Sequence, residues 1–177
     1  IVSFHISYLS IRSRTFFRST RITTEAKLAI AGKVCEFLGT PFDRTSFMKE
    51  LVASARDNSE KDFLRLALAS TYLDLMQVEN AMATYRETSA VSSGDIKASC
   101  EYGIARCLEV SGKDKEALEA YGRFATAFPD SPLRDEALLR SAIITLYEKP
   151  DSDSARDMLL KLRNGGKSPE LRGNASF

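Results

Sequence analysis

The feature that most constrains how this chain can fold is a pattern of small and aromatic residues that returns after 36 residues. Four positions recur with matching chemistry: Leu68, Ala69, Ala81 and Tyr85 return as Ile104, Ala105, Ala117 and Tyr121. Two antiparallel helices joined by a short turn approach closely only where their side chains are small, so the paired alanines predict contacts between helices. One helix pair cannot bury its own apolar face. The pattern therefore predicts stacked pairs that share a core.

The residues between Pro41 and Pro129 favour helices. This stretch has no proline, little glycine and many Ala, Leu, Glu, Lys and Arg residues, which are good helix formers. No alternation of apolar and polar residues bounded by hairpin turns indicates a strand. We therefore expect an all-α fold of stacked antiparallel helix pairs. The predicted helices cover residues 24–38, 44–56, 60–76, 79–91, 95–111, 114–127, 133–148 and 153–163.

Local signals predict where several of these helices begin or end. Ser59, with Asp62 three residues later, is typical of a capping box and predicts the start of the third helix. Gly112 predicts a left-handed residue at the end of the fifth helix. Ser131 followed by Pro132 predicts the start of the seventh.

The repeated pattern resembles the tetratricopeptide repeat, a helix–turn–helix unit of about 34 residues. A first unit at residues 62–95 matches at Ala69, Tyr72, Ala81 and Tyr85. A second unit at about 98–131 matches at Ala105, Leu108, Gly112, Ala117, Tyr121 and Pro129. A weaker third unit has Ala142, Leu146, Ala155 and Leu159, and residues 24–56 are expected to form a degenerate or capping pair. The resemblance implies an α-solenoid of about three to four repeats.

The chain also departs from the family pattern. Its units lie 36 and about 38 residues apart, it has no tryptophan, and Ser93 stands where the family has proline. The longer spacing resembles the repeats of bacterial envelope-assembly proteins at Tyr121, Phe124, Phe128, Pro129 and Ser131. A plain helical bundle that uses the same core residues is the alternative.

The net charge of +1 combines two unlike regions. The first 24 residues contain no Asp or Glu and carry a charge of +4 on Arg12, Arg14, Arg18 and Arg21, whereas the remainder carries −3. This balance excludes a uniformly basic nucleic-acid binder and a uniformly acidic chain. We predict a basic arm at residues 1–23, a repeat domain at 24–163 and a flexible tail at 164–177.

The basic arm allows three interpretations. It has the Arg-rich, Ser-rich and acid-poor composition of an organelle transit peptide. The same arginines could dock the chain on an anionic surface of phosphates or lipid. The third interpretation is an unstructured leader without a partner. Because the chain begins with Ile1, we expect a fragment or a processed product.

No catalytic constellation is present in the sequence. The only histidine, His5, lies in the arm, so the repeat region cannot form a Ser–His or Cys–His pair. The three cysteines have no CxxC spacing, and Cys100 and Cys107 are expected to be buried. We expect a non-catalytic protein without a cofactor, a metal or a small-molecule substrate. The alternative is a helper domain of an enzyme that uses a reactive cysteine or paired carboxylates.

The resemblance implies a concave face, lined by the first helix of each pair, that binds a protein or peptide. The predicted partner-binding residues on this face are Ser70, Asp74, Tyr102, Arg106, Glu109, Arg140, Tyr147 and Glu148. Tyrosine and arginine are frequent interface hot spots, and an arginine fits a carboxylate or a peptide carbonyl. An ordinary solvated helix face with ion pairs is the alternative explanation.

The sequence is compatible with more than one cellular compartment. Cysteines without a disulfide pattern favour a reducing intracellular compartment, the cytoplasm or an organelle matrix. The bacterial envelope is the alternative, with the basic arm docking an assembly factor at the membrane.

Overall fold

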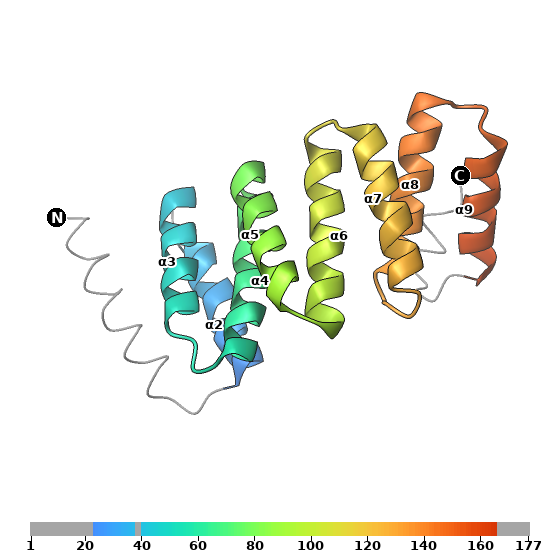
Figure 1. The fold of residues 1–177 in the computed structure, drawn as a ribbon. Coiled ribbons are helices and arrows are strands. Elements are labelled where there is room, and N and C mark those ends of the chain that lie inside the picture. Colours follow the sequence, from blue (N-terminus) through green and yellow to red (C-terminus); the bar gives the residue numbers. More distant parts are fainter. Residues whose placement is uncertain (1–22, 38–39, 166–177) are drawn as a thin grey trace. The chain divides into compact units, whose positions relative to one another are not determined.

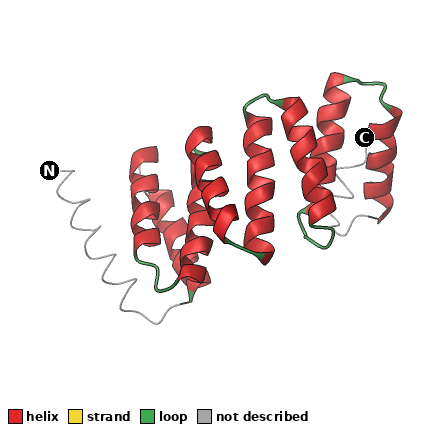
Figure 2. Cartoon of the chain, viewed as in Figure 1, coloured by secondary structure: helices red, strands yellow, loops and turns green. Residues whose placement is uncertain are grey.

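The computed structural model describes residues 23–37 and 40–165, which form α-helices joined by short connections (Figure 1). The chain divides into two compact units, residues 1–92 and 93–177. The first unit contains α2 (Thr24–Phe37), α3 (Pro41–Ala53), α4 (Asn58–Asp74) and α5 (Val78–Val91). The second contains α6 (Gly94–Val110), α7 (Asp114–Ala127), α8 (Arg134–Glu148) and α9 (Asp153–Gly165). The described residues contain no strand (Figure 2), which confirms the all-α prediction.

The helices pack as antiparallel pairs, as the repeat predicts. Within the first unit α4 packs against both α5 and α3, and within the second unit α7 packs against both α6 and α8. The predicted small residues lie in these contacts, because Ala69, Ala81, Ala105 and Ala117 are all fully buried. Tyr121 is also fully buried. The alanines therefore allow the close approach of neighbouring helices.

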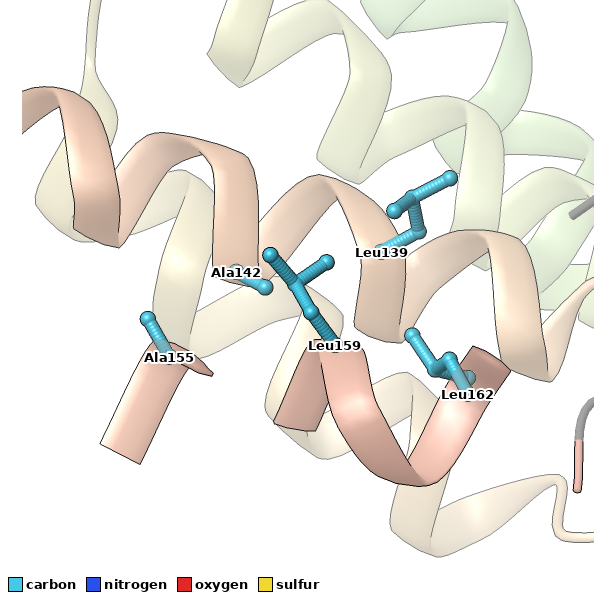
Figure 3. Close-up of a cluster of buried hydrophobic side chains, with 5 residues drawn as sticks. All are labelled: Leu139, Ala142, Ala155, Leu159 and Leu162. Carbon is cyan, nitrogen blue, oxygen red and sulfur yellow. The ribbon is translucent and has the colours of Figure 1, made fainter. Parts of the chain in front are cut away.

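The weak third unit is also a packed helix pair. Figure 3 shows the cluster that joins α8 to α9. The buried members of this cluster are Leu139, Ala142, Ala155, Leu159 and Leu162. Three of these residues carry the small-and-apolar pattern predicted for this unit, and its fourth residue, Leu146, packs against the cluster partly buried.

Three predicted helix starts are wrong. α3 runs from Pro41 to Ala53 and not over 44–56, because Thr40 caps it and its hydroxyl accepts the Asp43 N–H at 3.1 Å. α4 begins earlier than predicted, because its N-cap is Asp57, whose carboxylate accepts the Glu60 N–H at 2.8 Å, and not Ser59 with Asp62. α8 begins at Arg134, with Leu133 at the N-cap position. The Ser131 hydroxyl instead accepts the Leu133 N–H at 3.3 Å, in the turn that precedes the helix.

The turns inside the two clear repeats have the same geometry. Gly112 lies in the left-handed region with φ of 69°, which confirms its predicted role, and Met76 takes the same conformation with φ of 58°. Corresponding hydrogen bonds close both turns, Gln77 N–H to Tyr72 C=O at 2.8 Å and Lys113 N–H to Leu108 C=O at 3.0 Å. The repeat therefore extends to the backbone of the turn.

The predicted arm and tail fall almost entirely outside the described residues, and so do Arg12, Arg14, Arg18 and Arg21. α9 continues to Gly165, two residues beyond its predicted end. None of the helices in the described ranges has the length and apolar character needed to cross a membrane.

Candidate partner-binding surfaces

The second unit brings four of the predicted partner-binding residues together. The Arg140 guanidinium on α8 donates from Nε to the Tyr102 hydroxyl on α6 at 3.0 Å. Its Nη1 lies 3.0 Å from Glu109 Oε1, also on α6. Arg106 Nε lies 3.7 Å from Glu109 Oε2. We call Tyr102, Arg106, Glu109, Tyr121, Glu136 and Arg140 the α6–α8 network.

Two members of this network were not among the predicted site residues. Glu136 Oε1 lies 3.0 Å from Arg140 Nε, one helical turn away on α8. Tyr121 on α7 donates its hydroxyl proton to Glu109. The spacing of Glu136 and Arg140 is a local signal that could have been found in the sequence. The bond from Tyr121 is not local, and the sequence pattern assigned this residue only to the core.

The α6–α8 network is partly buried and balanced in charge. Burial raises the pKa of Tyr121 far above its ordinary value, and its hydrogen bond to Glu109 raises it further. Burial alone would lower the pKa of Arg140, but Tyr102 and Glu109 beside it raise the pKa above the ordinary range. Two guanidinium groups therefore face two carboxylates, and the network holds α6 against α8.

The structure does not bring Tyr147 and Glu148 into this network. Both lie exposed near the end of α8, and Tyr147 is 87% exposed. Ile143 lies one turn before Tyr147 and is 45% exposed. Helical spacing places Ile143 and Tyr147 on one face of α8, so these two side chains form an exposed apolar pair.

In the first unit, Ser70 and Asp74 line a pocket of about 390 Å³ between α2, α3 and α4. We call it the α2–α4 pocket. Its apolar lining consists of Leu28, Ala31, Met48, Ala67 and Leu75. Ser70 and Asp74 on α4 are among the predicted partner-binding residues, whereas no residue of α2 or α3 is among them. Gly32, in the middle of α2 and also at this pocket, is the local signal that could have indicated an open helix face.

The polar groups of the α2–α4 pocket differ in their surroundings. The Thr71 hydroxyl donates to the Ala67 carbonyl at 2.9 Å. Arg44 has an interaction of its own within the protein. The side chains of Ser70 and Asp74 are exposed and make no hydrogen bond or ion pair with another residue of the described ranges. Both side chains are exposed to solvent at the pocket.

A buried ion pair ties α2 to α4 in the same unit. Lys27 Nζ lies 2.6 Å from Glu60 Oε1, with the two side chains 0% and 2% exposed. Arg56 completes the cluster, with its Nε at 3.1 Å from Glu60 Oε2. Burial by itself would raise the pKa of Glu60, but hydrogen bonds from Arg56 and Lys27 lower it to about 2. Local sequence patterns did not predict this pair.

Other candidate sites are limited. No group of His, Cys, Asp or Glu in the described part of the chain has an arrangement that could hold a metal ion. Cys100 and Cys107 are both fully buried in α6, as predicted. A thiol in such surroundings is shielded from reagents in solution.

Comparison with known proteins identifies one region. Residues 99–131 match the family model of the tetratricopeptide repeat. This match coincides with the predicted second unit at about 98–131, and the prediction of tetratricopeptide-like helix pairs is confirmed. No curated protein and no solved structure matches the chain.

Proposed function

We propose that the chain is a non-catalytic scaffold that binds another polypeptide along the first helices of its pairs, because residues 99–131 match the tetratricopeptide repeat and the described helices pack in pairs. Such repeats generally mediate interactions between proteins. The observation that carries the proposal is the α2–α4 pocket, which opens between the first helices α2 and α4. It combines an apolar lining with the exposed side chains of Ser70 and Asp74.

The second unit has a different part in this proposal. In the α6–α8 network Arg140 is 26% exposed and its donors already face Tyr102, Glu109 and Glu136. Arg106 is 32% exposed, and its ion pair with Glu109 is long, at 3.7 Å. We therefore expect Arg106, together with the exposed Tyr147 and Glu148, to contact a partner more directly than Arg140 does.

Selection from a random peptide library displayed on phage tests this function with a defined probe. The immobilised full chain should enrich peptides that then bind it in solution. Substitution Ser70→Phe places a large side chain at the mouth of the α2–α4 pocket and should weaken their binding at least tenfold. The control Ala83→Phe puts the same side chain at an exposed position of α5 and should leave binding unchanged. Failure to enrich any peptide would contradict the proposal.

A second candidate function follows from the four arginines and the absence of acidic residues in the first 24 positions. The arm would dock the scaffold on an anionic membrane. Removal of residues 1–22 should then reduce sedimentation with vesicles that contain phosphatidylserine, and the loss should be largest at low salt. Equal sedimentation of the full chain and the chain without residues 1–22 would contradict this second proposal.

A further inference from the structure

The α2–α4 pocket offers a ligand two kinds of surface that lie side by side. Its apolar lining comes from three helices and includes Leu28, Met48 and Leu75. At about 390 Å³ it falls in the range of ligand-binding pockets, which is about 300–1,000 Å³. Such a pocket has room for one large aliphatic side chain and the backbone beside it.

Gly32 keeps the α2 side of this pocket open. A glycine inside a helix costs about 0.5–1 kcal/mol relative to alanine, so it needs a reason. A Cβ atom added at Gly32 would meet no other atom within 4 Å. Close packing in the free protein is therefore not the reason. A glycine here lets a bound chain approach the helix backbone closely.

Two opposite charges line the pocket, and Asp74 is the more exposed of them because Arg44 is partly buried. Asp74 is exposed, and its carboxylate has no partner among the residues that the structure describes. Arg44, the basic group at the pocket, already interacts within the protein. A cation brought next to an apolar surface attracts a carboxylate more strongly than the same pair does in open water. Asp74 therefore favours a positively charged group beside the apolar one.

We propose, on the basis of the function proposed above, that the α2–α4 pocket binds a polypeptide segment in which a large aliphatic side chain lies next to a lysine or arginine. The aliphatic side chain enters between α2, α3 and α4, and its neighbour pairs with Asp74. The hydroxyl of Ser70 stands one helical turn from Asp74 and donates to a backbone carbonyl of the bound segment.

Charge reversal at Asp74 tests the specificity. Random decapeptides are selected in parallel on the wild-type chain, on Asp74→Lys and on the control Asp157→Lys, which makes the same change at an exposed position of α9. The wild type and the control should enrich an aliphatic residue next to Lys or Arg. The Asp74→Lys chain should enrich an aliphatic residue next to Asp or Glu and bind the wild-type peptides at least fivefold more weakly.

Filling the pocket tests the location. Substitution Gly32→Leu should reduce binding of the enriched peptides at least tenfold, while Gly122→Leu in α7, where added atoms also meet open space, should not. Both substitutions replace glycine by a better helix former, and circular dichroism should show intact helices. Peptides without a basic residue, or a preference unchanged by Asp74→Lys, would overturn this inference and leave the proposed function standing. Enrichment of no peptide would instead remove the proposed function.

Discussion

The two clear repeats, α4 with α5 and α6 with α7, share a scaffold but differ in the polar side chains that tie them to their neighbours. Small residues and the turn geometry coincide at an offset of 36 residues. The first helices differ, since Leu66, Ser70 and Leu73 in α4 correspond to Tyr102, Arg106 and Glu109 in α6. The repeated positions therefore build the helix pair, and the positions between them differ in the side chains that they present.

The polar contacts also lie at different places along the first helices of the two repeats, at the start of α4 and in the second half of α6. In α4 the tie is at the start of the helix, where Glu60 meets Lys27 of the preceding pair. In α6 it involves Tyr102 and Glu109, which meet Arg140 of the following pair. The first tie is fully buried and the second is partly exposed. We therefore expect the buried contact in the first unit to contribute more to the free energy of unfolding than the partly exposed contact in the second unit.

Removal of the lysine from the buried tie should have the largest effect. Substitution Lys27→Met removes the buried cation from the Glu60 carboxylate and leaves it with Arg56 and the Thr24 hydroxyl, so it should lower the free energy of unfolding by about 4 kcal/mol. Urea unfolding followed by circular dichroism measures this loss. The control Lys33→Met, on the same helix, removes an exposed pair with Glu36 and should cost less than about 0.5 kcal/mol. Equal losses in the two variants would show that the buried pair does not hold α2 to α4.

Acid should weaken the same tie. The pKa of Glu60 is about 2 in the folded protein against an ordinary value of 4.5. The ionised carboxylate therefore stabilises the folded state fully above pH 4.5 and loses this effect as the pH falls towards 2. We expect a loss of about 3 kcal/mol across this window, at about 1.4 kcal/mol for each pKa unit.

The variant Glu60→Gln isolates this contribution from those of the other carboxylates. The difference in unfolding free energy between the wild type and Glu60→Gln should shrink by that amount between pH 6 and pH 2. A difference that stays constant with pH would contradict the lowered pKa of Glu60.

The tie in the second unit should be weaker. Substitution Arg140→Met keeps the aliphatic stem but removes the contacts to Tyr102, Glu109 and Glu136, and it should cost about 2 kcal/mol. The control Arg123→Met removes an exposed pair with Glu119 on α7 and should change the unfolding free energy by less than about 0.5 kcal/mol. If Arg140→Met lowers the unfolding free energy as little as the control does, then Arg140 does not stabilise the fold. It would then be expected to contact a partner directly, as Arg106 is.

The contrast between scaffold and ties also explains which features the sequence could predict. The helices, the buried alanines and the left-handed Gly112 follow from signals within a few residues, and the structure confirms them. The bonds from Arg140 to Tyr102 and Glu109 join residues 38 and 31 positions apart, so they depend on which helix faces meet. The start of α4 was missed for a related reason. Three consecutive residues are good N-cap residues: Asp57, Asn58 and Ser59. The structure uses Asp57, and Glu60 in the first turn of the helix then forms its buried pair with Lys27.

The smallest effect should come from the turn, where the repeats match in backbone but not in residue type. Met76 is 69% exposed and holds φ at 58°, a conformation that costs a side chain about 1–2 kcal/mol and costs glycine little. The turn of the second repeat has Gly112 at this position. Substitution Met76→Gly relieves the strain but adds freedom to the unfolded chain, so the net gain should be about 0.5 kcal/mol.

The reciprocal change should have the opposite sign. Gly112→Ala brings a Cβ atom into the left-handed region and should lower the unfolding free energy by about 1 kcal/mol. A Cβ there meets no atom within 4 Å, so any loss comes from the backbone conformation and not from a clash. Thermal unfolding of the two variants measures both effects. Destabilisation by Met76→Gly would contradict the prediction. It would show that contacts of the Met76 side chain stabilise the protein by more than its left-handed conformation costs, so that the two turns share a geometry but differ in energy.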